Sequence, residues 1–251
     1  MFVLQSQISI GAYRFTRIVE VEVMRSVHHL SATARLQMPV SSVIKGEGEV
    51  LGQEETARAV NIGDPVEIRL GYGRENHLEF KGYVRRINRS TPLEIECEDE
   101  FYQTRSQEVS FSGQTVKIAE LLNDCGLSVG EAADREVRNF VVDKQPVSEV
   151  LRRLAVECGL EVFFDLDGKV HAVVPGSRQA GTVKYVLHRN VIDADSSEIT
   201  AFLQPYAEPC MVAGITDENY PERDGKFLVE AVRTTFGKNG ARRRISLGKK
   251  I

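Results

Sequence analysis

The chain has 251 residues, of which 42% are hydrophobic and 27% are charged, the composition of an ordinary globular protein. Its formal net charge of −4 argues against a basic surface that attracts nucleic acid or anionic lipid. No apolar run approaches the roughly 20 residues of a membrane-spanning helix, and residues 1–15 lack a signal-peptide pattern. We therefore expect folding in the cytoplasm, without membrane insertion.

The N-terminal part of the chain, residues 1–105, has the pattern of one all-β unit. Strands are predicted at residues 2–10, 13–23 and 32–38. The polar stretch at residues 41–61 contains Gly46 and Gly48 and is long for a connection inside a compact domain. We expect this stretch to be either mobile or ordered by a partner.

Residues 63–98 carry the clearest pattern, and we expect the rest of the chain to be organised around them. Apolar and polar residues alternate at positions 66–70, 80–85 and 93–98, with turn-forming segments between these runs. Such alternation gives each strand one dry face and one wet face. The sequence therefore predicts an antiparallel meander, half of a small barrel.

The last strand of this meander places Glu94, Glu96 and Glu98 on one face, and Asp99 and Glu100 follow directly. Carboxylates that share a strand face repel one another, so each needs solvent or a cationic partner. A plain solvated face explains this row, and a functional surface is the alternative.

The sequence changes character at residues 106–175. Helices are predicted at residues 114–125 and 147–158, where apolar residues recur at helical spacing. Gly126 and Gly159 suit the C-terminal caps, and Pro146 suits the first position of the second helix. An Asp-Gly turn then predicts a hairpin of residues 160–164 and 169–174.

Residues 176–251 return to β-structure, with strands predicted at residues 183–187, 199–203, 210–215, 226–236 and 242–247. The last two strands follow the order of the earlier meander. The predicted fold class is therefore α+β and mainly β. Two small antiparallel β-barrel domains, residues 1–105 and 176–251, would flank a helix-containing α/β insert at residues 106–175.

No motif in the chain predicts catalysis. Residues 126–130 match the Gly-x-Ser-x-Gly pattern around Ser128, but a nucleophile elbow follows a strand and precedes a helix, and here a helix comes first. Asp165 and Asp167 resemble the start of a calcium loop, but the later ligand positions are missing. We therefore expect a helix cap at Ser128 and a hairpin turn at Asp165.

The other reactive residue types are too scattered to predict a site. The cysteines lack metal-binding spacing and are expected to be buried free thiols: Cys97, Cys125, Cys158 and Cys210. The histidines are expected on the surface or in packing: His28, His29, His77, His171 and His188. Arg242, Arg243 and Arg244 could touch a phosphate, protect a strand edge or meet acidic neighbours. We predict no catalytic, cofactor-binding or metal-binding residue.

Four parts of the chain, in order, resemble the hub proteins of phage tail baseplates, which include the late-control D-type tail proteins and the spike-carrying hubs of type VI secretion. The resembling segments are FTRIVEVEVMRSVHHLSATARLQMP (residues 15–39), GDPVEIRLGY with FKGYVRRI (residues 63–87), and residues 141–173 and 225–251. Each segment alone is a loose match, and their order and spacing make the resemblance specific.

The resemblance implies a structural, non-enzymatic protein of the virion tail baseplate, assembled in the host bacterial cytoplasm. Three copies would form a ring that joins the tail tube or distal tail protein to a spike or tip protein, with non-specific passage of DNA. It implies no cofactor and no metal. In such a ring Glu94, Glu96 and Glu98 would line the channel, since a wall without cations does not hold phosphate.

Two alternatives remain from the sequence. The chain could be the hub of a phage-related contractile injection device or type VI-like system rather than of a phage. A carbohydrate-binding or enzymatic module is less favoured, because tryptophan is absent and aromatic residues make up only 7% of the chain.

Overall fold

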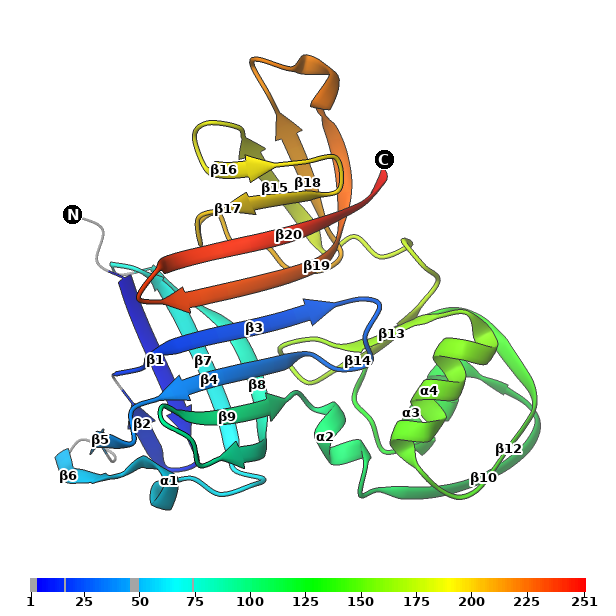
Figure 1. Cartoon of the computed structure of the whole chain (residues 1–251). Coiled ribbons are helices and arrows are strands. Elements are labelled where there is room, and N and C mark those ends of the chain that lie inside the picture. The colour runs from blue at the N-terminus through cyan, green and yellow to red at the C-terminus, as the bar shows by residue number, and fades with distance from the viewer. Residues whose placement is uncertain (1–3, 16, 46–49, 74) are drawn as a thin grey trace.

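The computed structural model describes residues 4–15, 17–45, 50–73 and 75–251, and β-strands account for most of them (Figure 1). The predicted mainly-β class is confirmed. No helix among the described residues is both long enough and apolar enough to cross a membrane.

The described residues of the N-terminal part form nine strands. They are β1 (Leu4–Ile10), β2 (Tyr13–Phe15), β3 (Glu20–Ser26), β4 (Thr33–Met38), β5 (Ser41–Lys45), β6 (Val50–Glu55), β7 (Pro65–Tyr72), β8 (Glu75–Asn88) and β9 (Leu93–Glu98). The predicted meander is confirmed, because β8 pairs antiparallel with both β7 and β9. The single strand predicted at residues 13–23 is wrong. β2 pairs with β1 while β3 pairs with β4, so the two pieces belong to different places in the sheet.

The polar stretch at residues 41–61 contains more structure than its composition indicates. β5 and β6 pair as a hairpin, β5 also pairs with β2 of the same chain, and the short helix α1 (Thr56–Ala59) follows. Gly46 and Gly48 lie outside the described residues. The described part of this stretch therefore finds its partners within the chain.

The middle of the chain builds two small sheets around two helices. The elements are α2 (Phe101–Thr104), β10 (Glu108–Lys117), α3 (Ile118–Asp124), β11 (Val129–Ala132), β12 (Glu136–Pro146), α4 (Val147–Cys158), β13 (Glu161–Phe164) and β14 (Val170–Val173). α4 spans the predicted residues and is capped by Gly159, whose φ is 60°. The helix predicted from residue 114 begins only at Ile118. The residues before Ile118 pair with β12 as strand, a non-local partner that local periodicity does not indicate.

The C-terminal part is again β-structure. Its elements are β15 (Gly181–Val186), β16 (Val191–Ala194), β17 (Glu198–Ala201), β18 (Met211–Thr216), the 3-10 turn η1 (Pro221–Arg223), β19 (Gly225–Gly237) and β20 (Gly240–Lys250). Five of these strands were predicted, and the short β16 was missed.

The two ends of the chain share one sheet. Its strand order is β16-β17-β20-β19-β3-β4-β9-β8-β7-β1-β2-β5-β6, and β18 joins β15 to β19. This path is open among the described residues, so the expected pair of barrels is not confirmed. The physical reason is the pairing of β19 with β3 over residues 231–237 and 20–26, which joins the two β units edge to edge. Leu203, Phe236 and Ala241 accordingly pack into the N-terminal core.

Candidate functional site

A layer of paired strands crosses the junction between the N-terminal and C-terminal parts. β17, β20, β19, β3, β4, β9 and β8 lie in consecutive order in this layer (Figure 1). One set of alternate residues faces the core, as Val21 and Val23 do on β3, and the other set faces outward. We call the outward set of paired ions the charged face: Glu22, Arg35, Arg86, Glu94, Glu96, Glu198, Arg233 and Arg244.

Strand register places opposite charges side by side on this face. Glu22 on β3 lies opposite Arg35 on β4, and Arg35 lies opposite Glu96 on β9. Glu96 in turn lies opposite Arg86 on β8. Opposite charges in directly paired positions attract, by about 0.2–1 kcal/mol for a pair. The four strands therefore carry a row of alternating sign.

Each arginine of the charged face is within ion-pair distance of a carboxylate. Arg233 Nη2 lies 2.8 Å from Glu22 Oε1, and Arg244 Nε lies 3.0 Å from Glu198 Oε1. Arg86 Nη1 lies 4.0 Å from Glu96 Oε1.

The fourth ion pair of the charged face joins Arg35 and Glu94. Arg35 is hydrogen-bonded to Glu94, and this bond lowers the pKa of the Glu94 carboxyl below its ordinary value. Asn88 Nδ2 donates to the other Glu94 oxygen over 3.2 Å. The four glutamates and four arginines that make up the charged face therefore balance one another in charge.

Glu98 differs from its neighbours Glu94 and Glu96. Its side chain is only 1% exposed, and its two carboxylate oxygens accept bonds of 2.7 and 3.1 Å from Arg105. Arg105 follows α2, which turns back at the end of β9. Alternation correctly places the three carboxylates on one face, but Glu98 presents no exposed charge there.

The three successive arginines near the C-terminus have three different surroundings. Arg244 belongs to the charged face, and Arg242 lines the same hollow but lies over the Phe202 ring at 5.3 Å. Arg243 points the other way, into the interior, where it is 1% exposed and pairs with the 3% exposed Glu79 of β8. Meeting acidic neighbours, one of the three roles considered from the sequence, is confirmed for Arg243 and Arg244.

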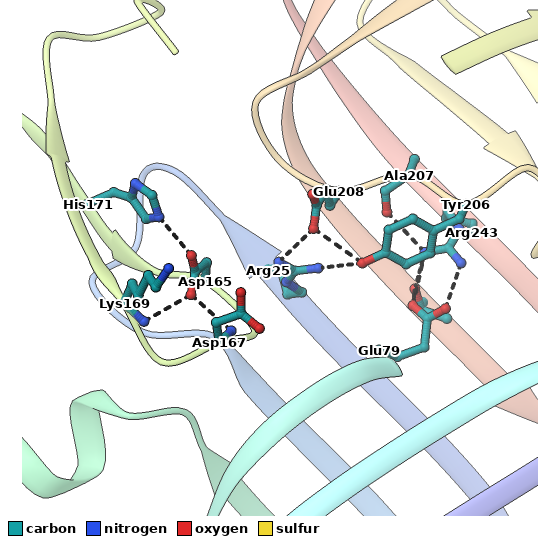
Figure 2. A network of polar contacts seen from close by, with 11 residues as sticks. Arg25, Glu79, Asp165, Asp167, Lys169, His171, Tyr206, Ala207, Glu208 and Arg243 are labelled. Carbon is teal, nitrogen blue, oxygen red and sulfur yellow. Dashed lines mark hydrogen bonds and ion pairs between the residues drawn. The ribbon is translucent and has the colours of Figure 1, made fainter. Parts of the chain in front are cut away.

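Arg243 ties the two ends of the chain together (Figure 2). Its Nη2 and Nη1 donate to the two oxygens of Glu79 over 2.7 and 3.0 Å, and its guanidinium also donates to the carbonyls of Leu203 and Ala207. The Tyr206 ring covers it at 5.0 Å. A buried charge needs such complete pairing, because desolvation is costly.

A second polar cluster lies beside this pair. Arg25 donates to the Tyr206 hydroxyl over 3.0 Å and to Glu208 over 3.3 Å (Figure 2). A cavity of about 210 Å³ separates Arg25 and Glu208 from the turn that carries Asp165 and Asp167. In that turn Asp165 accepts bonds from two backbone N–H groups and from His171 Nε2 at 3.0 Å. Among the described residues, no group of three or more His, Cys, Asp or Glu could hold a metal ion.

The other candidates from the sequence have structural roles. Ser128 is exposed and lies between α3 and β11, and Gly130 is required because a Cβ there would lie 2.4 Å from His171 Cε1. Asp165 is the partner of His171 that sequence spacing did not indicate. Cys158 is partly exposed, whereas the three other cysteines are buried, and all four are free thiols. Burial raises the pKa of Cys125 to about 11, so this thiol is unreactive at neutral pH.

No protein-family model matches the sequence, and no curated protein matches it. Solved structures do resemble the chain. The 43 kDa tail protein of prophage MuSo2 from Shewanella oneidensis superposes with a TM-score of 0.69 at 14% identity, over 98% of this chain and 97% of that one. The tail protein of Neisseria meningitidis MC58 gives 0.64 at 12% identity, over 99% and 96%.

A third similar structure comes from a secretion apparatus. The E. coli c3393 protein is a component of the type VI secretion system and exhibits structural similarity to the T4 bacteriophage tail proteins gp27 and gp5. It gives a TM-score of 0.62 at 9% identity, over 98% of this chain and 76% of that one. The chain therefore has the fold of these tail proteins, as the sequence resemblance predicted.

Proposed function

We propose that this chain is a structural protein of a phage-type tail and acts as the central hub of its baseplate. Three copies would form a ring between the tail tube or distal tail protein and the spike or tip protein. The observation that carries this proposal is the shared fold, which extends over 97% and 96% of two tail proteins rather than over a common submodule. The likeness to tail proteins supports a structural rather than an enzymatic role.

The proposed division of the chain keeps the units at residues 1–105, 106–175 and 176–251. Three core clusters support it: one dominated by strands β1–β9, one around α3 and α4, and one within β15–β20. In the ring each β unit would act as one barrel-like segment of the wall. A ring of three chains would then match a sixfold tube on one side and a threefold spike on the other.

In this ring the charged face would line the channel. The carboxylates proposed for the wall were Glu94, Glu96 and Glu98, and the proposal now rests on Glu94 and Glu96, since Glu98 is enclosed by Arg105. DNA would pass without specific contacts. A ring structure with Glu94 and Glu96 on its outer surface would refute this assignment.

A second setting is the hub of a contractile injection device or type VI-like system, which the likeness to the E. coli secretion component favours. The same ring and the same face would serve there, without DNA as cargo. Neighbouring genes for a tape-measure protein and a tail tube would distinguish a phage tail from a secretion device.

The test is the mass of the purified chain over a concentration series, by light scattering, with negative-stain images of large species. We expect a trimer with a central hole, either alone or after addition of the tail tube or spike protein encoded nearby. A monomer under all of these conditions would contradict the hub, and measurable glycan affinity of that monomer would favour a binding module instead.

A further inference from the structure

The charged face combines features that normally have opposite effects on nucleic acid. Exposed arginines bind phosphate strongly, because the planar guanidinium matches phosphate oxygens in two parallel hydrogen bonds. Four arginines gathered on one sheet face would therefore be expected to retain a DNA backbone. On this face, however, each of these four arginines lies within ion-pair distance of a glutamate. A fifth arginine, Arg242, lines the same hollow as Glu22, Arg233 and Arg244 and lies over the Phe202 ring instead.

Glu22 has the central position in this arrangement. It accepts the 2.8 Å bond from Arg233 on β19 and lies opposite Arg35 on β4. It thus stands between cations from the C-terminal and N-terminal units. The pairing of β19 with β3 brings these cations to it, since Glu22 and Arg233 are 211 positions apart in the chain.

Glu198 is the second carboxylate that lies among arginines of the charged face, on the side of β20 that is away from β19. It lies on β17, pairs with Arg244 of β20 at 3.0 Å, and also acts electrostatically on Arg233. The hydrogen bond that Arg233 donates to Glu22 raises the pKa of Arg233. The arginines therefore stay charged, and what the carboxylates change is the access of an outside anion to them.

We propose that Glu22 and Glu198 mask the arginines of the charged face and so prevent it from binding phosphate backbones. Resting on the proposed function, this assigns the low affinity of the channel wall to specific ion pairs rather than to a surplus of negative charge. Removing the masking carboxylates would convert the face into a non-specific DNA-binding surface.

The alternative is that these ion pairs only stabilise the sheet. Exposed ion pairs in general contribute little to stability. A purely structural role predicts a change in stability on mutation and no gain of binding. Binding of a polyanion is therefore the readout that separates the two explanations.

The experiment measures binding of a fluorescently labelled DNA duplex of mixed sequence to the full chain, by anisotropy. The variants are Glu22→Gln, Glu198→Gln and the double variant, compared with the native chain at about 50 mM salt and above. We expect no measurable binding by the native chain and saturable binding by the double variant. Because Arg233 and Arg244 are freed, its logarithmic affinity should fall by about 1.8 for each tenfold rise in salt.

A matched control removes the glutamate partners of two arginines elsewhere. On the exposed side of α4, Glu149 pairs with Arg152 and Glu157 pairs with Arg153, both at 2.9 Å. The double variant of Glu149→Gln and Glu157→Gln changes net charge by the same amount but does not touch the charged face. We expect it to bind no DNA, because Arg153 still donates to the Val141 carbonyl over 2.9 Å and lies over the Phe140 ring, so only Arg152 is freed.

Two outcomes would overturn the masking role: duplex binding by the native chain equal to that of the double variant, or equal binding by the variant and the α4 control. Adding Arg233→Gln to Glu22→Gln should abolish the gain, and a persistent gain would also count against it. If circular dichroism shows that the double variant does not fold, the same binding measurement is made on the single variant Glu198→Gln, which frees Arg244. Ring formation is measured separately by mass, so failure of masking and failure of the hub are distinguishable.

Discussion

Replacing Arg243 with methionine would break the buried connection between the two β units. Methionine keeps an unbranched apolar side chain but removes every donor, so Glu79 would remain a 3% exposed carboxylate without its cation. Removing one partner of a buried ion pair costs about 3–5 kcal/mol, because the remaining charge is left uncompensated. The carbonyls of Leu203 and Ala207 would lose their donor as well. We therefore expect a loss in the upper part of this range.

The free energy of unfolding, measured by urea denaturation of the native chain and of Arg243→Met, gives this loss directly. Two comparisons make the result specific. Glu149→Gln breaks an exposed pair on α4 and should cost less than about 1 kcal/mol. The double variant of Arg243→Met and Glu79→Leu removes both charges and should recover most of the stability lost in the single variant.

A loss below about 1 kcal/mol for Arg243→Met would refute this reasoning, since it would mean that Glu79 finds water or another cation without cost. A double variant as unstable as the single one would also be inconsistent with it. In that case packing of the arginine stem and of the Tyr206 ring, rather than the charge pair, would hold the junction.

Two further predictions concern the region around the end of β9. Burial raises the pKa of Asp99 to about 8, although the N–H groups of Ala32 and Phe101 favour its ionised form. The stability that the protonated form contributes is complete below the unfolded value of about 4 and is lost as pH rises through about 8. Asp99→Asn should therefore flatten the pH profile of the unfolding free energy over this window, and an unchanged profile would assign the dependence to another group. Gly82→Ala should lower the free energy of unfolding by about 1–3 kcal/mol, because the added Cβ would lie 2.2 Å from the backbone oxygen of Glu98. Denaturation as for Arg243→Met measures it, and a neutral effect would mean that β8 and β9 separate without cost.

Local patterns predicted those elements whose partners lie nearby in the chain. The meander β7–β9 and helix α4 depend on alternation, helical spacing and turn residues, and all of these are written in consecutive residues. The helix predicted from residue 114 failed at its start, and β10, β12 and β16 were missed. Each of these segments adopts its structure because of a strand partner, which local periodicity does not record.

The candidate site divides in the same way. Alternation along β9 places Glu94, Glu96 and Glu98 on one face, since successive side chains of a strand point to opposite sides. Alternation does not indicate that Arg105 encloses Glu98 or that Arg35 holds Glu94. Glu94 and Glu96 are consequently paired with arginines, and these counter-ions come from other strands.

The sequence by itself determined which residues of each strand face outward, because that depends only on backbone geometry with a period of two residues. The tertiary structure alone decided which charges meet. β3 reaches β19 across most of the chain length, and their register brings Glu22 to Arg233 and leaves Arg243 facing Glu79 inside. A shift of one residue would exchange the two faces, so this register decides which charges lie on the surface and which in the interior.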